Sequence, residues 1–320
     1  MPTHRQRAAQ AASDTRSQFA QVPYLSGTEP EGFLYQGSQP LPLLPRGVGY
    51  QLRSAVMEGD PFDIAIDWQN YSFPAPPGAT CAGQKAPPVY RDSIINEKMT
   101  NRILVLNTAN EKKPGGDWEG GFLGLGAEES LARRSNLVQT LHPQFYPLYD
   151  RGGIYSPGVI VFKGGHEQDY LNWETPRWTC VSVVSVAAVR RPKTDETGTR
   201  YSFSEERDLQ KEKMKTILRI AALNGHINLV LGGFGSCGPG TGSGDGNYPG
   251  SGNTTSPSRS TSIALSGTSS SYKNPIKDVC KLWKELLIDS EEFQGYFKNI
   301  VFAVGGGENG GQKEFRKYFG

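Results

Sequence analysis

Residues 102–137, RILVLNTANEKKPGGDWEGGFLGLGAEESLARRSNL, carry the pattern from which the fold is best predicted. The first six residues, 102–107, form a short apolar run typical of a buried strand. Residues 114–126 include six glycines, so backbone N–H groups there can approach a ligand closely. Residues 127–137 are predicted to form a helix with Glu128 and Glu129 in its first turn, where the helix dipole favours carboxylates. A strand, a glycine-rich loop and a helix N-terminus in this order form an arrangement that binds phosphate groups.

Each of these features also has a simpler explanation. Glycine-rich turns are common, and glutamates are ordinary residues at the start of a helix. Glu129 and Arg133 are spaced i,i+4, so they could form a surface ion pair and nothing more. The order of the features favours a phosphate-binding site, but neither a P-loop nor a Rossmann dinucleotide site. The loop lacks the Lys-Ser/Thr end of a P-loop, and no G-x-G-x-x-G opens the helix, which disfavours a Rossmann dinucleotide fold.

The same stretch resembles the microbial-type poly(ADP-ribose) glycohydrolase family, a branch of the macrodomain fold. The resemblance is carried by residues 107–110, by Pro-Gly-Gly at 114–116 and by Glu-Glu-Ser-Leu-Ala-Arg-Arg-Ser at 128–135. It extends more loosely from about residue 90 to the C-terminus. The usual family signature is three glycines, a short spacer and Gln-Glu-Glu. Here Asp117 replaces the third glycine, Ala127 replaces the glutamine, and residues 117–121 lengthen the spacer.

A second candidate loop follows another predicted strand, residues 227–231. It reads Gly-Gly-Phe-Gly-Ser-Cys-Gly at 232–238. Two glycine-rich loops that follow two strands would hold a diphosphate from both sides with backbone N–H groups. In the family a similar loop wraps the diphosphate, and Phe234 could pack near a ribose. The alternative for Phe234 is a core position beneath the loop. The aromatic residue that follows this loop in the family is absent here.

The resemblance implies an ADP-ribosyl glycohydrolase that needs no cofactor and releases ADP-ribose from poly(ADP-ribose) or ADP-ribosylated macromolecules. Adjacent glutamates on a helix project about 100° apart, so they must have different roles. By resemblance, Glu129 is the acid/base and Glu128 orients a ribose hydroxyl. The ligand-binding residues that we expect are Asn110, Gly115, Gly116, Asp117, Gly233, Phe234, Gly235, Ser236, Cys237 and Gly238.

Two alternatives to this function remain open. Ala127 in place of the glutamine suggests a reader that binds ADP-ribose without hydrolysing it, and a hydrolase of another ADP-ribose derivative is also possible. Asp117 likewise has two explanations. It can stabilise a turn, because Asp bonds its own nearby backbone, or it can contact a ribose and position the attacking water.

The predicted fold is α/β, a macrodomain-like three-layer sandwich with a mixed sheet and an N-terminal helical extension. Residues 1–89 are expected to be a helical and loop extension that packs on the core, with a helix at 4–22 and a possible short strand at 63–68. Residues 90–320 form the predicted catalytic core, with a short helix at 90–99, helices from 202 and 278, and strands at 158–162, 179–189 and 300–304. The Gly/Ser-rich tract at 239–272 is predicted to be a flexible insertion.

Composition excludes several other classes of function. The net charge of +2 without a dense Lys/Arg run gives no indication of nucleic-acid binding, and no apolar run reaches membrane-spanning length. The N-terminus lacks the apolar segment of a secretory signal. The cysteines and histidines have no spacing typical of a metal site or a catalytic triad, and His226 is expected to be structural. We therefore expect reduced thiols in an intracellular protein, no metal, and a monomer. The four cysteines are Cys81, Cys180, Cys237 and Cys280.

Overall fold

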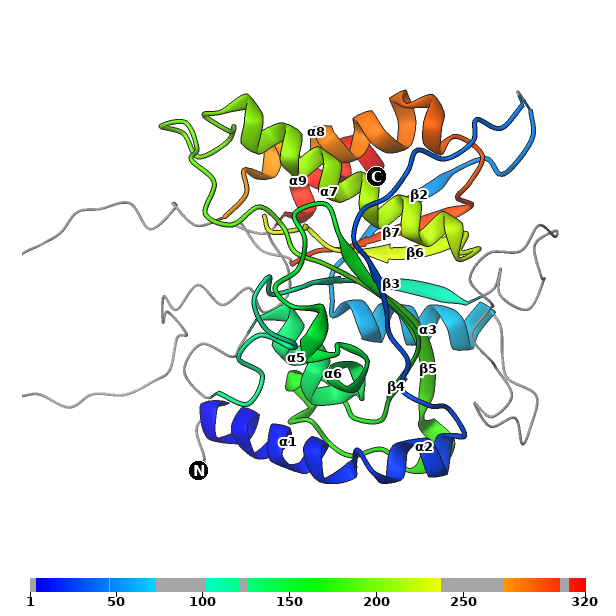
Figure 1. The fold of residues 1–320 in the computed structure, drawn as a ribbon, viewed down its shortest axis with the longest axis vertical. Helices are drawn as coiled ribbons and strands as arrows, with labels where there is room; N and C mark the ends of the chain where they lie inside the picture. Colours follow the sequence, from blue (N-terminus) through cyan, green and yellow to red (C-terminus); the bar gives the residue numbers. More distant parts are fainter. Residues whose placement is uncertain (1–3, 46, 73–101, 121–125, 237–272, 306–310) are drawn as a thin grey trace, which may run out of the picture.

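A seven-stranded mixed sheet forms the centre of the protein (Figure 1). The computed structural model describes residues 4–45, 47–72, 102–120, 126–236, 273–305 and 311–320. The strand order is β1-β4-β5-β3-β6-β7-β2. The strands are β1 (Phe33–Tyr35), β2 (Arg53–Met57), β3 (Ile103–Thr108), β4 (Gly153–Val161), β5 (Thr179–Val186), β6 (Asn228–Leu231) and β7 (Asn299–Ala303).

Strand β3 is the central strand and is buried almost throughout. It pairs in parallel with β5 on one side and with β6 on the other. Strands β6, β7 and β2 continue in parallel, whereas β4 runs antiparallel to both β5 and β1. All strands except β4 therefore point the same way, and the carboxyl ends of β3, β6 and β7 meet at one edge.

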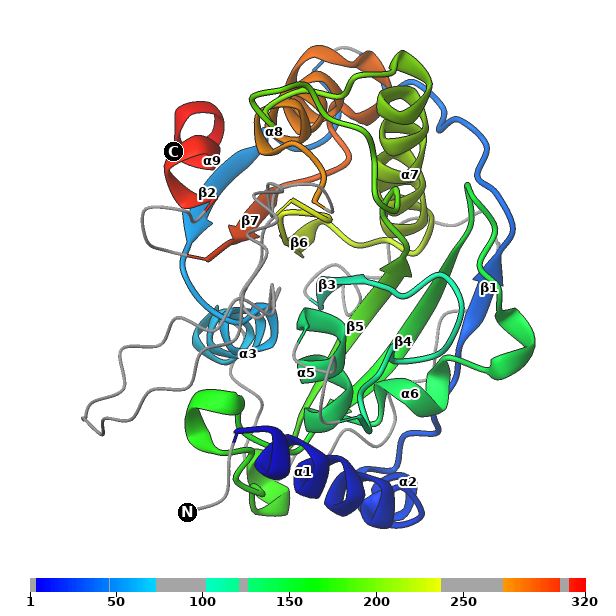
Figure 2. The same ribbon diagram turned by 90° about the vertical axis from the view of Figure 1, so that its left-hand side faces the viewer.

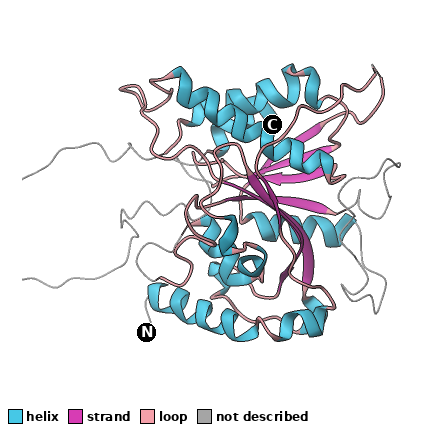
Figure 3. Ribbon diagram, in the orientation of Figure 1, coloured by secondary structure: helices cyan, strands magenta, loops and turns pink. Residues whose placement is uncertain are grey.

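Helices cover both faces of the sheet, which gives three layers (Figures 1 and 3). Helices α7, α8 and α9 lie on one face, and α3, α5 and α6 lie on the other, with α1 and α2 outside α5 and α6. The predicted three-layer α/β sandwich with a mixed sheet is confirmed. The helices are α1 (His4–Gln18), α2 (Gln21–Ser26), α3 (Pro61–Ser72), α5 (Ala127–Arg134), α6 (Leu137–Thr140), α7 (Ser204–Leu223), α8 (Ile276–Lys284) and α9 (Gln312–Phe319).

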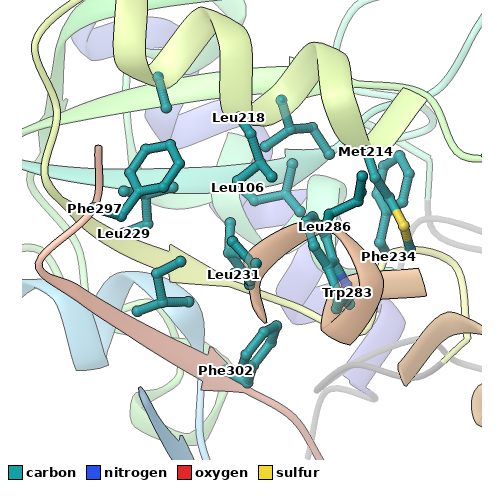
Figure 4. Packing of buried hydrophobic residues seen from close by; sticks show 14 of the residues in the cluster. Leu106, Met214, Leu218, Leu229, Leu231, Phe234, Trp283, Leu286, Phe297 and Phe302 are labelled. Carbon is teal, nitrogen blue, oxygen red and sulfur yellow. The ribbon is translucent and has the colours of Figure 1, made fainter. Parts of the chain in front are cut away.

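Two hydrophobic clusters hold the layers together. The larger lies between the sheet and α7–α9 and includes Leu106 of β3 and Trp283 of α8, both buried (Figure 4). The second lies on the opposite face and joins α3 and α5 to the same strands. Because successive side chains of a strand point to opposite faces, Leu104 and Leu106 of β3 enter the first cluster while Ile103 and Val105 enter the second.

The strand predicted at 63–68 is wrong, because these residues belong to helix α3. Alternating Ile64, Ile66 and Trp68 imitate a strand pattern. The decisive signal is Asp60 followed by Pro61 at the first helical position. The Asp60 carboxylate accepts a hydrogen bond from the Phe62 amide at 2.8 Å and so caps the helix.

The N-terminal part of the chain contributes more than a helical and loop extension. Strands β1 and β2 form the two edges of the sheet (Figure 2). Strand β1 has three residues, and β2 is exposed along most of its length, so neither has a buried alternating pattern that sequence analysis could detect. Of the other predictions, the helix at 90–99 and the insertion at 239–272 lie outside the described residues. Among the described helices, none combines the length and hydrophobicity needed to cross a bilayer.

Candidate active site

A cavity of about 240 Å³ lies at the carboxyl ends of β3, β6 and β7. From β3 the chain continues to β4 and β5 on one side, and then returns through α7 to β6 on the other side. Ligands of open α/β sheets bind where the strand order reverses in this way. The two glycine-rich loops that were predicted to meet both contribute residues to this cavity. Its lining residues are Pro61, Leu106, Thr108, Ala109, Asn110, Gly126, Ala127, Glu128, Glu129, Leu131, Gly232, Gly233, Gly235 and Ala303.

Glu128 is the buried member of the glutamate pair, with only 4% of its surface exposed. Its Oε2 accepts a hydrogen bond from the Asn110 backbone amide at 2.6 Å, and its Oε1 faces Asn107 Nδ2 at 3.3 Å. Burial raises the pKa of the Glu128 carboxyl to about 8, and the charge of Glu129 adds to the increase. Hydrogen bonds from Asn110, Asn107 and Gly115 oppose it. Burial therefore favours the protonated form of Glu128 in the ligand-free protein.

Asn107 supports Glu128 from beneath. Its Nδ2 also lies 3.1 Å from Ser185 Oγ of β5, and the side chain is fully buried. Its Oδ1 is buried and has no hydrogen-bond partner among the described residues. A protonated Glu128 would satisfy this oxygen if the Asn107 carboxamide turned over. The buried hydroxyl of Tyr146 likewise has no partner in the described chain, and burial together with Glu128 raises its pKa.

Glu129 is half-buried and lines the cavity beside Glu128. Its Oε1 accepts a hydrogen bond from the Asp117 backbone amide at 3.3 Å. The first glycine-rich loop passes so close that a Cβ on Gly116 would lie 2.5 Å from Glu129 Oε1 and 3.2 Å from Glu128 Oε2. Gly116 also has φ +60°, a conformation that favours glycine. Gly115 and Gly116 therefore shape the glutamate pair from the side, although neither is among the residues that line the cavity.

Asp117 occupies the position of the missing third glycine and belongs to a turn. Its carbonyl accepts a hydrogen bond from the Gly120 amide at 2.9 Å, and its Oδ1 lies 3.4 Å from Lys113 Nζ. A Cβ on Gly120 would lie 2.0 Å from Asp117 Oδ2, so the carboxylate lies against Gly120. This geometry favours the turn explanation over contact with a ribose or a water.

Within the described part of the chain, Arg133 does not form the ion pair with Glu129 that the i,i+4 spacing allowed. Its side chain is fully buried, and its Nη2 donates to the carbonyl of Gly120 at 3.3 Å. Its Nε and Nη1 have no hydrogen-bond partner among the described residues. The i,i+4 spacing allows an ion pair, but the Arg133 side chain is buried instead. Helix α5 packs against α1, where Thr15 Oγ1 donates to the backbone carbonyl of Arg133 at 2.6 Å.

The second loop forms a tight turn over residues 233–236, in which the Ser236 amide donates to the Gly233 carbonyl at 3.0 Å. Phe234 and Gly235 have positive φ values of +37° and +86°. Two successive positive φ values define a type I′ turn. The amides of Gly233, Phe234 and Gly235 donate to no other described residue, so this turn presents a run of unpaired N–H groups of the kind that binds anions.

The Phe234 ring is a core residue, which is the second of the two explanations considered for it. It is 0% exposed and lies 6.3 Å from Trp283, centroid to centroid, inside the larger cluster (Figure 4). Only its backbone is placed to meet a ligand. Cys237 and Gly238, the last residues predicted for this loop, lie outside the described residues.

Asn110, predicted to bind the ligand, lines the cavity, and its side chain stabilises its own loop. Asn110 Oδ1 accepts hydrogen bonds from the Lys112 and Lys113 amides at 2.8 and 3.3 Å. Sequence analysis missed Pro61 and Ala303, which line the cavity from α3 and β7. Neither carries chemistry, so only the strand order could have identified them.

His226 is buried and has the structural role expected. Its ring lies 2.8 Å from the Tyr155 hydroxyl and 3.2 Å from the Arg102 carbonyl, and burial lowers its pKa to about 4. In the described residues, no group of His, Cys, Asp and Glu side chains is arranged to hold a metal ion.

Comparison with known proteins agrees with this architecture. Residues 89–164 match the family model for the microbial-type PARG (poly(ADP-ribose) glycohydrolase) catalytic domain. A crystal structure of poly(ADP-ribose) glycohydrolase from Thermomonospora curvata is similar over 98% of this chain and 99% of its own, with 22% identity and a TM-score of 0.61.

Two ligand complexes are similar as well. The Thermomonospora curvata enzyme with the inhibitor ADP-HPD has 22% identity and a TM-score of 0.59, over 97% of this chain and 98% of its own. The enzyme from Deinococcus radiodurans with ADP-ribose has 19% identity and a TM-score of 0.53, over 94% of this chain and 91% of its own. No curated protein matches the chain. The structural likenesses show that the fold is that of bacterial poly(ADP-ribose) glycohydrolases, and the resemblance seen in the sequence is confirmed for residues 89–164.

Proposed function

We propose that this protein is an ADP-ribosyl glycohydrolase that cleaves the glycosidic bond of a ribose in poly(ADP-ribose) or in ADP-ribosylated macromolecules. One observation carries the proposal. Glu128 and Glu129 line a single cavity together with Gly233 and Gly235 of the turn whose amides have no partner among the described residues. Carboxyl groups beside an anion-binding turn are what a substrate with a diphosphate next to a ribosyl bond requires.

The two sides of the cavity have different tasks. Backbone amides of residues 233–235 bind the diphosphate, because N–H groups stabilise anions without adding a side chain. Glu128 is protonated, so it places no negative charge near the phosphates and can hydrogen-bond a ribose hydroxyl. This division also explains why one glutamate is held by Asn107 and Asn110 while the other has, among the described residues, a single backbone donor.

Cleavage requires a proton for the leaving oxygen and a stabilised oxocarbenium-like transition state. Glu129 is the half-buried glutamate with the freer carboxyl, and we assign it the acid role. When the negatively charged diphosphate binds beside it, Glu129 takes up a proton, which it donates to the leaving ribose oxygen as the glycosidic bond breaks. The resulting carboxylate then takes a proton from the water that attacks the ribosyl cation, which restores the acid.

Incubation of the protein with poly(ADP-ribose), with a mono-ADP-ribosylated protein and with ADP-ribosylated nucleic acid would test this function. Release of free ADP-ribose, measured by chromatography, identifies the hydrolase and its substrate class. Glu129→Gln is the matched control, because the amide keeps the shape but cannot donate a proton as an acid does. We expect it to bind ADP-ribose with an affinity within about 10-fold of wild type and to lose turnover. Tight binding by the wild-type protein without release on any substrate would instead identify a reader.

We also propose that the protein acts as a monomer inside the cell. The four cysteines are far apart in the sequence and have no metal-ligand spacing, and reduced thiols in an intracellular protein are the usual state of such cysteines. Size-exclusion chromatography with light scattering tests the first proposal, and localisation of the tagged protein tests the second.

A further inference from the structure

The turn at residues 233–236 is held in an unfavourable backbone conformation. Phe234 has φ +37°, and a bulky residue with positive φ is uncommon because its Cβ meets the neighbouring carbonyl oxygen. Such a conformation persists only where the surroundings enforce it. The enforcing contacts come from two buried residues, through the side chain of Gln210 of α7 and the backbone amide of Asn274 just before α8.

Gln210 links the turn to the end of β5. It is fully buried, and its Nε2 donates to the Phe234 carbonyl at 3.0 Å. Its Oε1 accepts a hydrogen bond from the Val189 amide at 2.8 Å. Both ends of the carboxamide are therefore engaged, one on the turn and one on the segment that follows β5.

Asn274 makes the matching link on the other side. Its backbone amide donates to the Gly235 carbonyl at 3.0 Å, and its Nδ2 donates to the Val189 carbonyl at 2.9 Å. The fit is tight, because a Cβ on Gly235 would lie 2.5 Å from Asn274 Nδ2. The Tyr201 hydroxyl donates to Asn274 Oδ1 at 2.7 Å and fixes the orientation of the carboxamide.

We propose that Gln210 and Asn274 are positioning residues that hold the 233–236 turn, through Val189, in the conformation that presents its amides to the diphosphate. They bind the two central carbonyls of the turn, Phe234 and Gly235. Because the C=O and the next N–H of one trans peptide point in opposite directions, the bond to the Phe234 carbonyl directs the Gly235 amide away from Gln210, and the bond to the Gly235 carbonyl holds the end of the turn at Ser236. The proposal rests on the proposed function, since it assumes a diphosphate ligand for the turn.

The test compares Gln210→Met with Thr140→Val. Gln210→Met removes both hydrogen bonds at similar volume. Thr140 is also fully buried and bonds the Ser156 hydroxyl at 2.6 Å, but it lies on α6 and contacts neither the turn nor the glutamates, so its variant controls for general loss of stability. We expect Gln210→Met to raise the Kd for ADP-ribose, measured by calorimetry, by about 10-fold or more, the value of one charge-assisted hydrogen bond. The turn binds a part of the substrate that does not react, so KM should rise while kcat stays near wild type.

A second readout needs no ligand. Hydrogen exchange of the Ser236 and Asn274 amides, both bonded within this turn, should be faster in Gln210→Met than in the wild type and in Thr140→Val. Gln210→Glu provides a rescue. A buried glutamic acid that stays protonated at low pH can still donate to Phe234, whereas the carboxylate cannot, so ADP-ribose affinity relative to wild type should recover as the pH falls.

The outcomes separate the two proposals. Unchanged exchange and unchanged affinity in Gln210→Met, at a stability loss equal to that of Thr140→Val, would overturn the positioning role. If the turn exchanges faster in Gln210→Met but the wild-type protein does not bind ADP-ribose, the proposed function and the diphosphate role of the turn are both overturned. Faster exchange with weaker binding and an unchanged kcat supports both.

Discussion

The burial of Glu128 predicts that the stability of the protein falls as the pH rises. The pKa of this carboxyl is about 8 in the folded protein and 4.5 in the absence of burial. Between those pH values the folded protein binds one proton more than the unfolded chain, so each increase in pH favours unfolding. The stabilisation is complete below about pH 4.5 and is lost once the pH has risen past about 8.

The difference of about 3.5 between the two pKa values corresponds to at most about 5 kcal/mol, at about 1.4 kcal/mol for each unit. Glu128→Gln removes this titration. The new amide can accept from Asn110, and it can donate to the buried Oδ1 of Asn107 that has no partner among the described residues, provided that the Asn107 carboxamide turns over. The folded structure should therefore tolerate the variant.

Urea unfolding of the wild type and of Glu128→Gln at several values from about pH 5 to about pH 9 measures the effect. The free energy of unfolding of the wild type should fall relative to that of the variant by at least about 2 kcal/mol across this range. Other groups with a shifted pKa, such as Lys163, are present in both proteins, so their contributions to the pH dependence cancel in the comparison. Glu119→Gln removes an exposed carboxylate that is paired with Arg16. Its free energy of unfolding should change with pH in parallel with that of the wild type. Parallel curves for Glu128→Gln and wild type would refute the reasoning, because Glu128 would then be ionised in the folded protein at neutral pH.

Three further substitutions test the site and its support. Gly116→Ala places a Cβ 2.5 Å from Glu129 Oε1 at positive φ, so turnover should fall by roughly 10-fold or more with a smaller loss of ADP-ribose affinity, measured by steady-state kinetics and calorimetry. Asp117→Asn keeps the turn, so turnover should stay within about 2-fold of wild type; a fall of roughly 100-fold would restore the water-positioning role. Arg134→Met removes the buried guanidinium that bonds Asp60 at 2.6 Å and also Asp63. The free energy of unfolding, measured in urea, should fall by roughly 2–3 kcal/mol. This is less than for a fully buried pair, because the Asp63 side chain is 38% exposed. An unchanged urea midpoint in Arg134→Met would mean that the two carboxylates are fully hydrated without it.

Local sequence predicted the elements that carry the chemistry. Three predicted elements are observed: the strand that contains Asn107, the helix that begins at Ala127 and the strand before Gly232. Each has a local signal in the sequence, either an apolar run or a carboxylate in the first turn of the helix. Their convergence followed from a general rule about the carboxyl ends of parallel strands. The adjacent glutamates were assigned different roles from helical geometry, and their burial does differ.

Long-range packing decided the features that the sequence left open. Whether Arg133 faces Glu129 or the interior depends on α1 packing against α5, more than a hundred residues away in the chain. The position of Phe234 depends on Trp283 of α8. Gln210 and Asn274 carry no recognisable motif, since their importance comes from the carbonyls that the fold brings within reach. Helix α3 was missed for a different reason, because its alternating apolar residues imitate a strand while its start signal, Asp60 and Pro61, precedes that pattern.

The two edge strands have a consequence for synthesis. Strands β1 and β2 leave the ribosome early, yet Arg53 of β2 aligns with Asn299 of β7, near the far end of the chain. Until β7 is made, β2 has no neighbour within the sheet, and such distant pairing is slow to form. The nascent chain therefore carries an unpaired strand from the synthesis of β2 until that of β7, a state in which chains tend to associate with one another. Production of this protein should consequently depend on the elongation rate and on chaperones, and a product that stops short of β7 should be insoluble even though it contains both Glu128 and Glu129.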